Sequence, residues 1–161
     1  PGTDALLMLA MIHTLFDKQL AAADQLLGFA PDLLMVEKYV VDYPAHRVAN
    51  LIGMSEAQII GLVESFCAAG PAVCYGRMGA SVQAFGTLTQ YLIMLFNMLT
   101  GNLDRQGGMM FTQPAADFLP HSGRGAIANF HTRVRNLPAF AGEFPVSALA
   151  EEMTTEGEGQ I

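Results

Sequence analysis

The sequence has little charge. Charged residues make up 14% of its 161 positions, whereas hydrophobic residues make up 52%. This composition excludes intrinsic disorder of the chain as a whole, because disordered chains combine low hydrophobicity with high charge. It also predicts apolar surface that is available to a partner, to self-association, or to the rest of a longer protein.

Basic residues are especially few. Eight Lys and Arg stand against fifteen Asp and Glu, which gives a formal net charge of −7. An acidic chain gains no affinity by releasing counterions from a phosphate backbone. A general nucleic-acid binder is therefore excluded.

Cysteine is also scarce, and it is not arranged for metal binding. The two cysteines, Cys67 and Cys74, form no CxxC motif, and the four histidines have no HxxxH spacing. A disulfide framework and a self-contained zinc or iron–sulfur site are excluded on this basis. No Ser-His-Asp or Cys-His set can be assembled, so we assign no catalytic residue and no metal ligand to this chain.

The sequence contains no apolar run long enough for a membrane span. Residues 78–103 carry no formal charge, but glycines and polar residues interrupt them, and the unbroken apolar stretch is only 91–96. A spanning helix needs about 20 mostly apolar residues. No signal peptide is visible at the start, and both ends look cut. We expect a cytoplasmic protein, and a periplasmic location stays open.

Hydrophobic periodicity predicts a helix-dominated α/β fold. Ser55 is expected to cap an amphipathic helix that Gly70 ends. The short apolar run 72–75, followed by a glycine, is typical of a buried parallel strand. From residue 113 onward, recurrent prolines predict an irregular connection, with helical signal only at 146–153. The helix capped by Ser55 covers 56–69, and the other helices are expected at 5–20, 33–41, 48–52 and 83–99.

The first candidate site is Gly2-Thr3-Asp4, directly before the first apolar helix. Thr3 or Asp4 can simply cap that helix. A carboxylate here can also accept both N–H groups on one edge of guanine, in a charge-assisted bidentate contact. Both interpretations can hold together.

The second candidate is the loop Gly76-Arg77-Met78-Gly79, between the expected strand and the long helix that starts near Gln83. In open α/β sheets, ligands lie beyond the carboxyl ends of strands and beside helix N-termini. Arg77 is the only charge between Glu64 and Asp104. The alternative is an ordinary turn with a surface Arg, because the spacing is not GxGxxG.

Two further loops are candidates. Thr100-Gly101-Asn102 and the glycines after it can form a helix C-cap and turn, or a loop that lies against a cofactor. The segment 121–125 can bind an anion or be a solvated loop.

The order of these segments is more specific than any one of them. It resembles the molybdopterin oxidoreductases of the dimethyl-sulfoxide-reductase and formate-dehydrogenase type, over about residues 1–112. The resemblance is carried by Gly-Thr-Asp before an apolar helix, a Ser-led helix that ends in Ala-Ala-Gly, Ala-Val-Cys-Tyr-Gly-Arg-Met-Gly, and Leu-Thr-Gly-Asn-Leu-Asp-Arg-x-Gly-Gly.

The resemblance implies an internal fragment of a catalytic subunit. Residues 1–112 would form a helix-rich, partial Rossmann-like layer with a short parallel sheet, and 113–161 would lead toward the neighbouring domain. The cofactor implied is bis(molybdopterin guanine dinucleotide) with molybdenum or tungsten, and a 4Fe–4S cluster would lie in the parent outside this segment. The implied partners are the remaining domains of the same polypeptide. The cofactor-contacting residues implied are Gly2, Thr3, Asp4, Gly76, Arg77, Met78, Gly79, Gln83, Thr100, Gly101 and Asn102.

The sequence also departs from the family. Many relatives have one residue fewer between the positions of Met78 and Gln83. Formate dehydrogenases continue after Gly108 with Arg-Gly-Gln-Asn-Asn, where this chain has Met-Met-Phe-Thr-Gln, which argues against formate as the substrate. Because the metal-ligating segment is absent from this sequence, we expect no turnover from the isolated chain. Two alternatives stay open: a stand-alone helical interaction module without catalysis, and another nucleotide-binding α/β enzyme.

Overall fold

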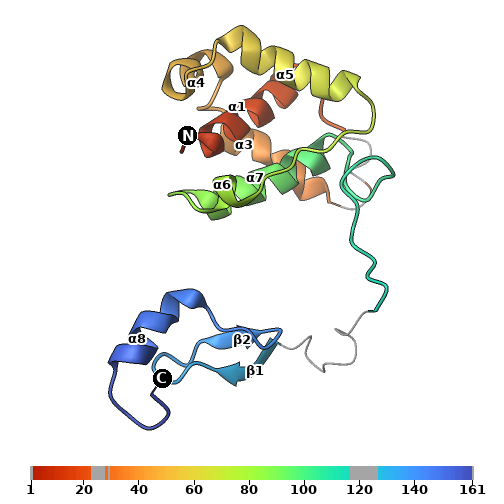
Figure 1. Ribbon diagram of the computed structural model, residues 1–161. Helices are drawn as coiled ribbons and strands as arrows, with labels where there is room; N and C mark the ends of the chain where they lie inside the picture. Colours follow the sequence, from red (N-terminus) through yellow and green to blue (C-terminus); the bar gives the residue numbers. More distant parts are fainter. Residues whose placement is uncertain (1, 23–27, 29, 117–126, 161) are drawn as a thin grey trace. The chain divides into compact units, whose positions relative to one another are not determined.

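The computed structural model describes residues 2–22, 28, 30–116 and 127–160 (Figure 1). The chain divides into two compact units, Pro1–Phe111 and Thr112–Ile161. The fold is a helix-rich mixture of α and β structure. The only sheet among the described residues has two antiparallel strands, so the expected parallel sheet is not seen in them.

The first unit is built around helix α1, which has α5 on one side and α7 on the other (Figure 1). The first turns of α1 are apolar on every side, and Ala10, Ile12 and Leu15 are fully buried, as a helix covered from several directions requires. The helices of this unit are α1 (Asp4–Asp17), the 3₁₀ helix η1 (Pro31–Val36), α3 (Glu37–Val40), α4 (Ala45–Ile52), α5 (Glu56–Ala68), α6 (Met78–Ser81) and α7 (Gly86–Leu99).

Helices α1 and α7 lie side by side in the same direction. The N–H of Ala22, beyond the end of α1, donates to the carbonyl of Leu99 at the end of α7, at 2.7 Å. Phe96 of α7 is fully buried, and its ring packs on Phe66 of α5 with 5.0 Å between centroids. The parallel arrangement brings the N-terminal ends of α1 and α7 together.

The predicted start and end of α5 are confirmed. Ser55 accepts a hydrogen bond from the N–H of Gln58, and the Gln58 side chain accepts one from the N–H of Ser55, which forms a capping box. Gly70 follows the helix with a φ of +80°, a conformation that favours glycine.

The long helix expected from Gln83 is interrupted, and α7 begins only at Gly86. The carbonyl oxygen of Ser81, at the end of α6, lies so close to Gly86 that any Cβ there would overlap it. Glycine at this position therefore allows the backbone at the start of α7 to lie directly against the end of α6.

The prediction of a buried strand at 72–75 is wrong for the described residues. The segment pairs with no other strand, and Val73 and Tyr75 are exposed. Its inner residues, Ala72 and Cys74, are half-buried, so exposure alternates along it as in an extended chain. The apolar run thus predicted an extended backbone, but a strand needs a neighbour, and no described residue supplies one.

The second unit contains more regular structure than the expected irregular connection. Strands β1 (Ile127–His131) and β2 (Pro138–Phe140) pair antiparallel, and η3 (Val146–Ala148) leads into α8 (Leu149–Thr154). The helix falls where the sequence indicated helical signal. The strands were missed because prolines and glycines surround them.

No single helix among the described residues is long and apolar enough to cross a membrane; α4 and α5 reach the required length only as a pair bent by 110°.

Candidate functional site

Two of the three segments that the resemblance implies as cofactor-contacting meet at the N-terminal ends of α1 and α7. The side-chain amide of Gln83 donates from Nε2 to Oδ2 of Asp4 at 2.9 Å, although the two residues are 79 positions apart in sequence. Gly2 lies at the same place, because a Cβ on it would be 4.0 Å from Oε1 of Gln83. We call this place, formed by Gly2–Asp4 and Gly76–Gln83, the Asp4 rim.

Gln83 holds the Asp4 rim together. Besides Asp4, its Nε2 donates to the carbonyl oxygens of Gly79 and Ala80, each at 3.1 Å. These bonds tie the segment Gly76–Gln83, which contains α6, to the start of α1. The bond from Gln83 also orients the Asp4 carboxylate. Because this carboxylate is exposed, its remaining lone pairs are available to a ligand.

Gly76 and Gly79, the two glycines of the loop, differ in what surrounds them. A Cβ on Gly76 would be 2.5 Å from Cδ1 of Ile93 and 3.2 Å from Nε2 of Gln90, so a larger residue here would displace the ends of these two side chains of α7. A Cβ on Gly79 would meet nothing within 4 Å. The backbone at Gly79 is therefore open to the approach of a ligand.

Arg77 is the charge that the sequence singled out, and it is exposed. It stands at the N-cap position of α6. Among the described residues it makes no ion pair. Met78 beside it is 71% exposed. The Asp4 rim thus combines one carboxylate, one free guanidinium and one accessible glycine backbone.

The capping interpretation of Thr3 is supported only in part. Thr3 occupies the N-cap position of α1, but its side chain makes no capping hydrogen bond. Asp4 is the first residue of the helix, where a negative charge is favourable.

The third predicted segment lies elsewhere. Thr100, Gly101 and Asn102 follow the C-terminal end of α7, a helix of 14 residues, which is about 21 Å long at about 1.5 Å per residue. Asn102 is 1% exposed; its Oδ1 accepts from the N–H of Ala72, and its Nδ2 donates to Oγ1 of Thr100 at 3.0 Å. Gly101 has a φ of +70°. These features fit the alternative interpretation, a helix C-cap and turn.

Asn97 has a structural role that the sequence analysis missed. It is fully buried, and its side chain accepts from the N–H of Cys74 at 2.9 Å and donates to the carbonyls of Cys74 and Ile93 at 2.8 Å each. A polar residue on the core side of an otherwise apolar helix is the signal that could have revealed it. Asn97 fixes the segment before the Asp4 rim to α7.

The cysteine thiols are not activated. Burial raises the pKa of both Cys67 and Cys74 above the ordinary value of a thiol. A raised pKa disfavours the thiolate, which is the nucleophilic form. Burial thus disfavours the reactive thiolate form of both residues.

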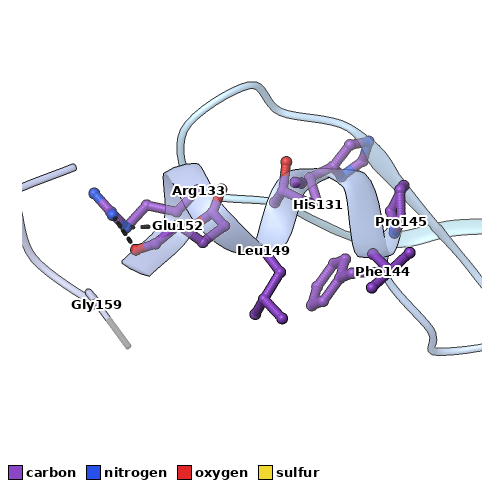
Figure 2. A pocket seen from close by; sticks show the side chains of 10 residues that line it. His131, Arg133, Phe144, Pro145, Leu149, Glu152 and Gly159 are labelled. Carbon is purple, nitrogen blue, oxygen red and sulfur yellow. Dashed lines mark hydrogen bonds and ion pairs between the residues drawn. The ribbon is translucent and has the colours of Figure 1, made fainter. Parts of the chain in front are cut away.

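A hollow of about 420 Å³ in the second unit was not anticipated from the sequence (Figure 2). Arg133 lies at one side of it and donates from Nη2 to the carbonyls of Glu152 and Thr155, at 3.0 and 2.7 Å, while its Nε is 3.6 Å from Oε2 of Glu152. Nη2 of Arg133 is thus bonded within the unit, whereas its Nε is buried without a hydrogen-bond partner among the described residues. The other labelled side chains in Figure 2 are His131, Phe144, Pro145 and Leu149.

The described parts of the chain offer no metal centre: no group of three or more His, Cys, Asp or Glu side chains in them is placed to hold an ion. The segment 121–125 lies outside the described residues. For a guanine-tipped cofactor, the Asp4 rim fits in two respects, since it presents an oriented carboxylate and an open glycine backbone. The Thr100–Asn102 turn does not fit, because its side chains are bonded within the fold.

No protein-family model matches this chain, and no curated protein is significantly similar to it. Any functional assignment therefore rests on the residues and on the geometry of the Asp4 rim.

Proposed function

We propose that this chain supplies the guanine-contacting part of a molybdopterin guanine dinucleotide domain in a molybdopterin-dependent oxidoreductase. The observation that carries the proposal is the 2.9 Å hydrogen bond between Gln83 and Asp4. Two segments chosen from the sequence for the same ligand, and far apart along the chain, meet through it. If these two segments were unrelated surface turns, they would not need to lie in contact.

The residues of the Asp4 rim have distinct roles in this proposal. The Asp4 carboxylate accepts the two adjacent N–H groups of guanine, and Gln83 holds the carboxylate in place. The exposed Arg77 guanidinium and the open backbone at Gly79 face the pyrophosphate. Met78 lies against the ligand between them. We leave Thr100, Gly101 and Asn102 as predictions that the geometry does not support.

The chemistry belongs to the cofactor and not to this chain. When bound, molybdenum or tungsten on its two pterins would exchange electrons together with an oxygen atom or a hydride. The residues described here bind and orient one end of that group. Its metal ligand and any iron–sulfur cluster would come from other parts of the parent protein.

The proposal also includes the finer fold. The extended segment 72–75 leads directly into the Gly76–Gly79 loop and then into α6 and α7. This order matches one strand–loop–helix step of a Rossmann-like layer. A parallel strand from the remaining polypeptide would complete the sheet.

Guanine selectivity is the first test. GDP and ADP are titrated into the isotopically labelled chain, and the backbone amides of the Asp4 rim and the side-chain amide of Gln83 are followed by NMR. We expect GDP alone to shift these signals, and Asp4→Asn to weaken binding by about tenfold or more, because a neutral amide cannot accept both N–H groups.

Asp17→Asn is the matched control, because Asp17 is exposed on the same helix but at its other end. It should leave GDP binding unchanged. Equal shifts with ADP would favour another nucleotide-binding enzyme, and the absence of any shift would count against the Asp4 rim as a guanine site.

The cofactor itself is tested on the protein isolated from its natural source. Metal analysis should find molybdenum or tungsten in stoichiometric amount, and oxidation should release two fluorescent pterins for each metal atom. A pure protein with neither metal nor pterin would rule out the family assignment.

A second function is favoured by one observation. Met78, Val82 and Phe85 are 71, 73 and 63% exposed, so several large apolar side chains lie close together in sequence on the surface. A helical interaction module would use them to dock a partner. That protein would be monodisperse alone and would show no guanine affinity in the titration above.

A further inference from the structure

Helix α8 exposes its large apolar residues and covers its charged ones. Leu149 and Met153 are 46 and 49% exposed, whereas the side chains of Glu151 and Glu152 are only 33 and 14% exposed. A helix that packs on its own unit shows the opposite pattern, with the apolar stripe turned inward. The packing of the second unit therefore does not account for the apolar residues on the outer side of α8.

Hydrogen bonds and ion pairs hold α8 in this orientation. The carboxylate of Glu152 accepts from the N–H of Val134 at 2.8 Å and lies 3.6 Å from Nε of Arg133. Arg135 forms a second ion pair, with Glu151. Arg133 also donates to two carbonyls at the C-terminal end of the helix, where a positive charge is favourable. Turning the apolar residues inward would break these bonds, so they stay on the outside of the unit.

The hollow in Figure 2 lies beside these apolar residues. Val146 and Leu149 line it together with Phe144, and the side chains of Phe144 and Leu149 point to the same side of the helix (Figure 2). Val146, Leu149 and Met153 follow one another at helical spacing, so they form one stripe along η3 and α8. An apolar stripe with a hollow beside it is the kind of surface that receives the anchor side chains of a second helix.

Carboxylates border the hollow on two sides. Glu143 comes directly before Phe144, and Glu158 comes directly before Gly159; Phe144 and Gly159 both line the hollow and lie apart in Figure 2. Both glutamates are exposed, and among the described residues neither makes an ion pair. Lys or Arg on a partner would pair with them, whereas two copies of this face would bring like charges together.

We propose that the outer face of η3 and α8 docks an amphipathic helix of another protein, one that carries Lys or Arg beside its apolar residues. An apolar anchor of that helix enters the hollow, and basic residues on either side of the anchor face Glu143 and Glu158. The face offers side chains and no open strand edge, which favours a helix over an added strand as the partner.

A tryptophan-containing peptide tests this proposal, because the chain itself contains no tryptophan. The probe is a helical peptide of Leu and Lys, about 14 residues or about four turns long, with one Trp on its apolar face. Titration with the full chain should shift the Trp emission to the blue in a saturable way, and binding should weaken as salt rises. The same peptide with Glu in place of Lys should bind at least about tenfold more weakly.

Variants of the stripe locate the binding surface. Leu149→Gln and Met153→Gln each replace an exposed apolar side chain by a polar one, and each should weaken peptide binding by about tenfold, because less apolar surface is buried in the complex. Leu62→Gln is the matched control, since Leu62 is 42% exposed on α5 in the first unit. It should bind the peptide like the wild type.

A second pair of variants tests the charges. Glu143→Gln combined with Glu158→Gln should weaken binding of the basic peptide by about threefold and reduce its dependence on salt. Glu37→Gln combined with Glu64→Gln changes the net charge equally, at exposed positions in the first unit, and should have no such effect.

The proposal is overturned if the basic peptide gives no saturable shift up to about 1 mM, if the acidic peptide binds equally well, or if Leu149→Gln and Leu62→Gln bind alike. It is also overturned if the wild-type chain is a dimer that Leu149→Gln makes monomeric, because the face would then join two copies. Asp4→Asn should bind the peptide like the wild type, so failure here can be told apart from failure of the proposed function.

Discussion

A buried amide, Asn97, makes most of the side-chain hydrogen bonds that hold the segment before the Asp4 rim. Its side chain makes three hydrogen bonds, two of them to the backbone of Cys74, from a position that is fully buried. Without it, the Cys74 N–H and C=O would lose their only described partners. A buried backbone group without a partner costs about 1–3 kcal/mol.

We therefore expect Asn97→Ala to lower the free energy of unfolding by about 2–4 kcal/mol. Urea denaturation followed by circular dichroism measures the change. Asn50→Ala is the control, because Asn50 is exposed on α4 and should change stability by about 0.5 kcal/mol at most. A loss below about 1 kcal/mol for Asn97→Ala would mean that Cys74 is held in another way.

At the scale of elements, the helices were largely predictable and the strands were not. Helix α5 could be located from Ser55 and Gly70, because capping and helix-ending signals are local in sequence. The break before Gly86 could not, since it depends on a contact with Ser81 that only the folded backbone creates. An apolar run such as 72–75 indicates an extended backbone but cannot reveal whether a neighbouring strand exists.

The same distinction applies to the candidate site. Gly2–Asp4 and Gly76–Gln83 were chosen one by one from their residues, yet their meeting is a property of the parallel packing of α1 and α7. The Thr100 turn had two interpretations of equal weight, and the burial of Asn102 at 1% exposure decides for the structural one. Asn97 was missed because a lone polar residue in an apolar helix does not form a motif.

The capping box of α5 gives a prediction for one element. Ser55→Ala removes the acceptor for the N–H of Gln58, so we expect the free energy of unfolding to fall by about 1 kcal/mol. Thermal unfolding of the two proteins measures this. Ser65→Ala changes the same residue type at an exposed position inside α5 and should be neutral or slightly stabilising. If both variants lose the same stability, capping is not the cause.

At the scale of the whole molecule, the apolar core lies within one unit. Every member of the main hydrophobic cluster, from Ala5 to Leu99, belongs to the unit Pro1–Phe111. A chain cut after Phe111 should therefore keep its helical circular dichroism spectrum and unfold cooperatively in urea. The complementary piece, residues 112–161, should be largely unfolded alone, because a sheet of two strands with one short helix buries too little apolar surface. A noncooperative transition in the first piece would show that its core depends on residues beyond Phe111.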